Sequence, residues 1–216
     1  MTAFFITWTV FALYSFTRED LNLILYKFIP SFLKFFGYYQ RPLATLVFIL
    51  LSLIFTFIYL KKIRQKLPSK NLWLKWAVPV GVLGILAYPM FSHDIFNYLF
   101  NAKMVLIYQA NPHIRTAIEF RDLMLRFMHN IHTPAPYAYG WTAVSLVPGL
   151  AWFTQKFTLS FWAMKAFIGL FWLGELAVLK KLVTQLFPQQ PYRWWLFALS
   201  PLVLVETLIN GQTMSS

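Results

Sequence analysis

The chain has 216 residues, of which 59% are hydrophobic, 20% are aromatic and only 12% are charged. A soluble globular domain carries about 25% charged residues, and so few charges cannot solvate the surface of a water-soluble fold of this size. The 19 Lys and Arg residues outnumber the 7 Asp and Glu residues, an excess that indicates either nucleic-acid binding or membrane orientation. There is no cysteine, which excludes disulfides and thiolate metal sites.

Five apolar stretches are predicted to cross a membrane, because a bilayer core of about 30 Å requires roughly 20 apolar residues in a helix. In chain order they are residues 2–16, 42–60, 72–91, 159–179 and 194–209. Residues 21–37 read as an amphipathic stretch that lies at the membrane interface. The predicted fold class is therefore an all-α integral membrane protein, with residues 1–216 forming a single transmembrane domain.

The basic residues predict the orientation of these helices. Residues 61–75 contain six Lys or Arg and no acid, and residues 180–193 contain three more, again without an acid. By the positive-inside rule both stretches are cytoplasmic. The amino terminus then lies inside and the carboxy terminus outside a plasma or inner membrane, and residues 92–157 form a long extracytoplasmic loop.

Residues 140–153 are apolar enough to resemble a sixth span. They number only 14 and include Pro148 and Gly149, and such a length suits a re-entrant or interfacial helix better. A further span here would also place Lys180 and Lys181 outside. We therefore assign residues 140–153 to the juxtamembrane helices of the outer loop.

The residue types that can carry catalytic chemistry are concentrated in that loop: three of the seven acids and all four histidines lie between residues 93 and 132. Asp94, Asn97, Tyr98 and Asn101 recur at i, i+3, i+4 and i+7, so a helix would place them on one face. A carboxylate at the membrane boundary with amide and phenol groups beside it suits a general base that takes a proton from a hydroxyl. The alternative is that Asp94 only caps the helix.

The four histidines form no recognisable metal motif. His129 and His132 are three residues apart, and His93 and His113 could approach them, but no spacing is diagnostic of a metal site. Interfacial histidines explain the pattern at least as well, and Asp94 has no second acid beside it. We therefore expect no metal ligands and no cofactor.

Aromatic and polar side chains recur further along the chain. Tyr137, Tyr139 and Trp141 follow two prolines and could form either an interface belt or a surface on which sugars and prenyl chains pack. Glu206 and Asn210 lie one turn apart near the outer end of the last predicted span.

Two further charges lie in the fourth predicted span. Lys165 near its outer end could pair with Glu206 or hold a lipid phosphate. We interpret Glu175, which lies close to Lys180 and Lys181, as structural.

The order of three segments resembles the integral-membrane GT-C glycosyltransferases, in particular the polyprenyl-phosphate-mannose-dependent mannosyltransferases of bacterial cell-envelope assembly. These segments are SHDIFNYLFNAKMVLIYQANPH, PYAYGWTAVS and LSPLVLVETLINGQ. The resemblance covers most of the chain from residue 72 onward. Carried over to this sequence, the matching positions are the acidic catalytic Asp94, the pair Asn111 and Pro112, the aromatic segment with Tyr137 and Gly140, and the last motif with Glu206, Asn210 and Gly211.

The sequence departs from the family pattern in its last motif. Ser200 replaces the usual Asn before Pro201, and Gln212 stands where the family tends to have His, with no Asp after it. The family also continues through several more spans beyond this motif. We therefore expect the chain to be the front portion of a larger enzyme.

The resemblance implies hexosyl transfer, with mannose as the expected hexose, from a polyprenyl-phosphate sugar to an acceptor hydroxyl of a glycan or glycolipid at the outer face. Asp94 would be the general base, and Asn97, Tyr98, Asn101, Asn111, Tyr137, Tyr139, Lys165, Glu206 and Asn210 would bind the substrates. The competing hypothesis is a transporter or lipid-handling subunit in which Asp94, Lys165 and Glu206 line a polar pathway. We detect no repeat of the kind that transporters show, and the one-sided clustering of polar groups favours the enzyme. No nucleic-acid partner is expected.

Overall fold

The computed structural model describes residues 2–18, 31–63, 76–136, 139–190 and 193–211, and these parts of the chain contain helices and loops but no strand. The helices are α1 (Thr2–Tyr14), α2 (Ser31–Tyr39), α3 (Arg41–Ile63), α4 (Val78–Leu86), α5 (Asp94–Leu106), α6 (Tyr139–Gly149), α7 (Phe157–Leu186), α8 (Trp194–Ala198) and α9 (Pro201–Val203). The shorter helical elements are the 3₁₀ turns η1 (Ser15–Arg18), η3 (Ala117–Phe120), η4 (Leu123–Phe127) and η5 (Leu150–Thr154) and the π-helix η7 (Leu204–Ile209). The prediction of an all-α protein is confirmed for these residues.

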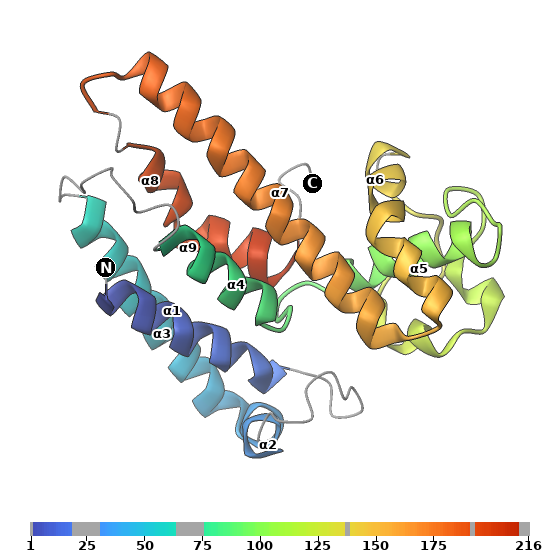
Figure 1. Ribbon diagram of the computed structural model, residues 1–216. Helices are drawn as coiled ribbons and strands as arrows, with labels where there is room; N and C mark the ends of the chain where they lie inside the picture. Colours follow the sequence, from blue (N-terminus) through green and yellow to red (C-terminus); the bar gives the residue numbers. More distant parts are fainter. Residues whose placement is uncertain (1, 19–30, 64–75, 137–138, 191–192, 212–216) are drawn as a thin grey trace.

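The helices form two groups joined by α7, which runs diagonally across the molecule (Figure 1). The amino-terminal part of α7 packs with α5, and Phe161, Met164 and Ile168 belong to that core. Further along α7, Trp172 and Leu176 pack in a second core with α1, α4 and α8. At 30 residues and a rise of 1.5 Å per residue, α7 is long enough to reach from the loop region to the opposite end of the bundle.

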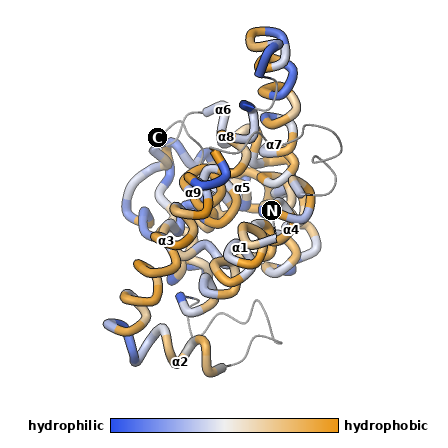
Figure 2. Tube along the Cα trace, turned by 90° about the vertical axis from the view of Figure 1, so that its left-hand side faces the viewer, coloured by the Kyte–Doolittle hydropathy of each residue, from blue (hydrophilic) through white to orange (hydrophobic). Residues whose placement is uncertain are grey.

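By length and apolar composition, α3 is the one helix in the described part of the chain that could cross a membrane. It is 23 residues long, and its most apolar window has a mean hydropathy of 2.6. Figure 2 shows it as hydrophobic along most of its length. Large apolar side chains such as Leu53 and Phe57 are exposed on it, as expected of a helix that faces lipid. The count of five spans stays a prediction.

Two predicted spans are not continuous helices. Within residues 194–209, Pro201 has no N–H to donate and forces Ser200 into an extended conformation (φ −60°, ψ 121°). The segment is therefore divided into α8, α9 and η7, and the prediction of one unbroken helix is wrong. Within residues 72–91, of which 72–75 lie outside the described residues, α4 ends at Leu86 because Ala87 is extended two residues before Pro89.

Three other predicted segments are found as helices of different lengths. Residues 2–16 form α1 and the start of η1, and residues 159–179 lie within α7. Residues 140–153 form α6 and η5, and the 11 residues of α6 are too few to cross a bilayer core. Of the predicted interfacial stretch 21–37, residues 21–30 lie outside the described residues, and the remainder lies in α2.

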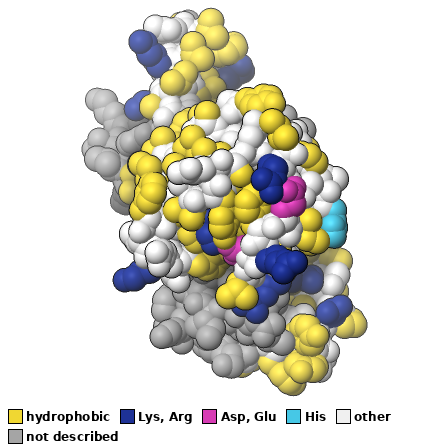
Figure 3. Space-filling model, turned by 90° about the vertical axis from the view of Figure 1, so that its right-hand side faces the viewer, with side chains coloured by type: hydrophobic (Ala, Val, Ile, Leu, Met, Phe, Trp, Pro, Cys, Tyr) yellow, Lys and Arg dark blue, Asp and Glu magenta, His cyan; other side chains and the backbone are white. Residues whose placement is uncertain are grey.

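The loops beside α5 and α6 carry much of the polar surface. Figure 3 views the molecule from this side and shows basic, acidic and histidine side chains among hydrophobic ones. This group of elements therefore carries the candidate site.

Candidate active site

Asp94 is the first residue of α5, and the residue before it, His93, is the N-cap. The Asp94 N–H donates to the Ser92 hydroxyl over 3.1 Å. The alternative that Asp94 is the N-cap is therefore wrong. Its carboxylate instead lies in the first turn, where the positive end of the helix dipole favours a negative charge.

The predicted polar face of α5 is present. The Asn97 amide donates to Asp94 Oδ1 over 3.5 Å, and Asn97, Tyr98 and Asn101 are all buried, while Asp94 is half-buried. The Tyr98 ring packs edge-on against Trp141 of α6, with ring centroids 5.4 Å apart. These side chains are thus held by packing against a second helix.

Helix α6 also connects this face to the Asn-Pro segment. Asn111 is exposed, and its side-chain oxygen accepts the His113 N–H over 2.9 Å. The His113 ring lies 4.0 Å from the ring of Tyr139 and forms a 2.9 Å hydrogen bond with Thr142. The structure therefore brings Tyr139 next to the Asn111 segment, whereas Tyr137 lies outside the described residues.

The close approach of α6 to α5 requires a glycine. A Cβ atom added at Gly149 would lie 2.6 Å from the Cβ of Ala102, far closer than two carbon atoms can pack. Gly149 thus allows the two helices to meet directly beside the polar face of α5.

A small polar hollow, with room for about one water molecule, opens beside Asn97 and Asn101. Pro112, Arg115 and Asn130 also line it. Arg115 and Asn130 were not among the predicted site residues, because nothing local in the sequence marks two loop residues that meet α5 only after folding. The hollow offers amide and guanidinium donors to a bound hydroxyl or phosphate oxygen.

The last motif meets the segment that leads into Asp94. The Asn210 side-chain oxygen accepts the Phe91 N–H over 3.2 Å, and its amide donates to Glu206 over 3.2 Å. Gly211, which follows, has a φ of 70°, a conformation that glycine adopts without strain. Asn210 is fully buried, and through these two hydrogen bonds it links Glu206 to Phe91, which precedes Asp94 by three residues in the sequence.

An apolar cleft of about 310 Å³ lies beside this contact. Residues from α1, α3, α9 and η7 line it, including Phe48, Phe55 and Leu202, with Phe91 and Glu206 also in its wall. The short segment from Phe91 to Asn101 therefore borders both an apolar cleft and a polar hollow.

Lys165 pairs with backbone carbonyls and not with Glu206. Its ammonium donates to the carbonyls of Gly84 (3.1 Å), Leu208 (2.5 Å) and Ile209 (2.9 Å), and the residue is 1% exposed. These carbonyls stand at the ends of α4 and η7, where backbone acceptors lack helical partners and the helix dipole is negative. The prediction of a Lys165–Glu206 ion pair is wrong, and this burial favours a structural role over one in phosphate binding.

The four histidines do not meet at one site. The rings of His93 and His129 stack with centroids 4.6 Å apart, and His93 also contacts the Phe127 carbonyl. His113 lies with Tyr139, and His132 is exposed. Over the described ranges, no three His, Asp or Glu side chains form a group that could hold a metal ion.

A family model described as alpha-(1->6)-mannopyranosyltransferase, N-terminal domain, matches residues 29–212. The chain belongs to this mannosyltransferase family. No curated protein and no solved structure matches the chain significantly. The matched residues contain α5, α6, α7 and the last motif, so the candidate site lies inside the region that defines the family.

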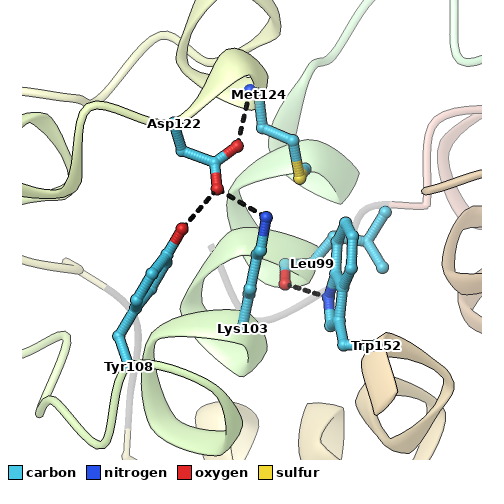
Figure 4. A network of polar contacts seen from close by, with 6 residues as sticks. All are labelled: Leu99, Lys103, Tyr108, Asp122, Met124 and Trp152. Carbon is cyan, nitrogen blue, oxygen red and sulfur yellow. Dashed lines mark hydrogen bonds and ion pairs between the residues drawn. The ribbon is translucent and has the colours of Figure 1, made fainter. Parts of the chain in front are cut away.

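The mannosyltransferase domain contains a second polar cluster, at the other end of α5 (Figure 4). Asp122 accepts hydrogen bonds from Lys103 (2.5 Å), from the Tyr108 hydroxyl (2.7 Å) and from the Met124 N–H (2.9 Å). Burial alone would raise the pKa of Asp122, but these hydrogen bonds outweigh it and lower that pKa below its usual value. Burial, together with the neighbouring Asp122 carboxylate, raises the pKa of Tyr108 to about 12.

These shifts predict how the cluster stabilises the mannosyltransferase at different pH. The lowered pKa of Asp122 contributes stability that is lost on acidification through its folded-state pKa, and the raised pKa of Tyr108 contributes stability that is lost between about pH 10 and 12. In thermal melts, Tyr108→Phe is expected to melt below the wild type at neutral pH, with the difference shrinking above pH 10. A difference that stays constant up to pH 12 would contradict the assignment.

Proposed function

We propose that this mannosyltransferase moves a mannosyl group from a polyprenyl-phosphate donor to an acceptor hydroxyl at the extracytoplasmic face of the membrane, within a GT-C-like fold. One observation carries the proposal: the segment from Phe91 to Asn101, which includes Asp94, borders both the apolar cleft and the polar hollow. A lipid-linked sugar has the same two parts, an apolar tail and a polar head. In this account the cleft takes the tail, and the polar side chains that line the hollow contact the head.

Asp94 acts as the general base. It accepts the proton of the acceptor hydroxyl as that oxygen attacks the anomeric carbon of mannose, and the bond from this carbon to the phosphate oxygen breaks. Polyprenyl phosphate is the leaving group. Donors from Asn97, Asn101 and Arg115, which line the hollow, stabilise the charge that develops on the phosphate.

Glu206 and Asn210 position this chemistry from the side of the cleft. Asn210 holds the Phe91 N–H and so fixes the backbone that leads into Asp94. Asn111 and Tyr139, at the junction with α6, contact the sugar or the acceptor, with Tyr137 beside them in sequence. Tyr98 and Trp141 support the same wall. In this account no protein-bound cofactor takes part.

Nucleotide sugars are cytoplasmic, so an active-site loop on the outer side of the membrane requires a lipid-linked donor. Locating the loop therefore distinguishes a lipid-linked donor from a soluble one. The chain has no cysteine, so a single introduced thiol reports its own accessibility. Leu123 is 80% exposed in the loop, and Gln189 is exposed in the basic stretch 180–193. In intact cells a membrane-impermeant maleimide is expected to label Leu123→Cys, and to label Gln189→Cys only after permeabilisation. The reverse pattern would overturn the proposal of a lipid-linked donor.

A further inference from the structure

A second hollow, of about 370 Å³, opens between the carboxy-terminal end of α5 and η5. It shares no lining residue with the hollow beside Asn97 and Asn101. Lys103 lies nine residues after Asp94, and at 100° per residue this spacing places the two on opposite sides of α5. The residues that line the second hollow are Lys103, Ile107, Tyr108, Trp152, Phe153 and Gln155.

The polar groups of this hollow are held in place by the Asp122 cluster. The Lys103 ammonium is bound by Asp122 and lies 4.7 Å from the centroid of the Trp152 ring. The indole N–H of Trp152 donates to the Leu99 carbonyl over 2.9 Å, as Figure 4 shows. The Lys103 and Trp152 side chains that line the hollow are thus fixed before any ligand arrives, which reduces the entropic cost of binding.

The charge of the hollow favours a neutral ligand. Asp122 already neutralises Lys103, and among the described residues no other Lys or Arg lines the hollow, so a phosphate or carboxylate finds no unpaired cation in this part of the structure. The ammonium has two further N–H groups, and the Gln155 amide can both donate and accept. Aromatic and aliphatic carbon from Phe153, Tyr108 and Ile107 completes the wall. Such a surface matches a sugar, which presents hydroxyl groups and an apolar ring face.

The backbone around this hollow adopts a conformation that L-residues seldom adopt. In the described part of the chain, the non-glycine residues with positive φ are Gln109 (50°), Arg121 (49°) and Gln155 (57°). Gln109 follows Tyr108, Arg121 precedes Asp122, and Gln155 lines the hollow itself. Strained residues of this kind cluster at functional sites, and here all three adjoin one cluster of side chains.

We propose that the hollow formed by Lys103, Tyr108, Trp152, Phe153 and Gln155 binds a neutral saccharide. Its role as a second anchor for the mannose-containing acceptor rests on the proposed function. The site is separate from Asp94, so an acceptor chain that reaches both would be held at two points.

The test is the binding of α-(1→6)-linked mannotriose to the full chain in lipid nanodiscs, measured by isothermal titration calorimetry. Gln155→Ala and Phe153→Ala change exposed side chains and are expected to weaken binding at least tenfold without changing the melting temperature. Phe187→Ala, which alters an exposed aromatic residue at the far end of α7, is the matched control and should bind as the wild type does.

Two further measurements keep this proposal distinct from the proposed function. Asp94→Asn should bind mannotriose normally, so a failure of the transfer chemistry leaves the binding result intact. Inorganic phosphate should not compete with the sugar. Any of three results would overturn the assignment: no binding of mannotriose, unchanged binding in Gln155→Ala and Phe153→Ala, or displacement of the sugar by phosphate.

Discussion

Replacing Asp94 with Asn is expected to reduce mannosyl transfer by about a hundredfold or more, because an amide cannot take the proton from the acceptor hydroxyl. The substitution keeps the size of the side chain and a hydrogen-bond acceptor for Asn97, which donates to Asp94 Oδ1. Expression level and melting temperature should therefore change little. The measurement is the initial rate of mannose transfer by the full chain in membranes.

Glu175→Gln is the matched control for this substitution. Glu175 is also a carboxylate and is partly exposed, but it lies further along α7 in an apolar groove with Leu170 and Phe197, away from α5. Its conversion to an amide should leave the transfer rate unchanged. An Asp94→Asn variant that turns over at the wild-type rate would rule out Asp94 as the base.

Replacing Lys165 with Met is expected to lower the free energy of unfolding by about 2–4 kcal/mol. Methionine fills a similar volume, but it leaves the carbonyls of Gly84, Leu208 and Ile209 buried without their common donor. Because Ile209 precedes Asn210, activity should fall together with stability. The measurement is thermal or denaturant unfolding in detergent, followed by tryptophan fluorescence.

Lys181→Met is the control, since Lys181 is exposed at the other end of α7 and its loss should leave unfolding unchanged. A role of Lys165 in binding the lipid phosphate gives a different pattern: the KM for the donor rises while the melting temperature stays the same. That outcome would contradict the structural role.

The sequence was most informative where one local property decides the structure. The apolar run at residues 42–60 predicted the core of α3, and the spacing of Asp94, Asn97 and Asn101 predicted their shared face on α5. The first follows from the length of a continuous apolar run, and the second from helical periodicity. Residues 140–153 form the 11-residue helix α6 and the turn η5, and their assignment as a juxtamembrane helix stays a prediction.

Sequence reasoning failed where a proline redirected hydrogen bonds. The break before Pro201 turned a predicted continuous span into three short segments, and the end of α4 before Pro89 frees the Gly84 carbonyl. At that end the Tyr88 N–H donates to the Ser15 hydroxyl over 2.8 Å. The carbonyls that Lys165 binds lie at the ends of α4 and η7, and the pattern of apolar residues does not indicate where these helices end.

Contacts between residues far apart in the sequence could not be predicted either. Lys103 and Asp122 are 19 positions apart, and neither stands out from the other charges of the loop. Their pairing depends on how the turns η3 and η4 fold back on α5. The polar hollow beside Asn97 depends on the same folding, since Arg115 and Asn130 come from separate loops.

The most direct test of the account is the choice of donor. The full chain, reconstituted in liposomes with a mannose-containing acceptor, is offered radiolabelled mannose either on polyprenyl phosphate or on GDP. We expect transfer from the polyprenyl-phosphate donor, loss of that transfer in Asp94→Asn, and none from GDP-mannose. Transfer from GDP-mannose without any lipid-linked intermediate would contradict the central claim.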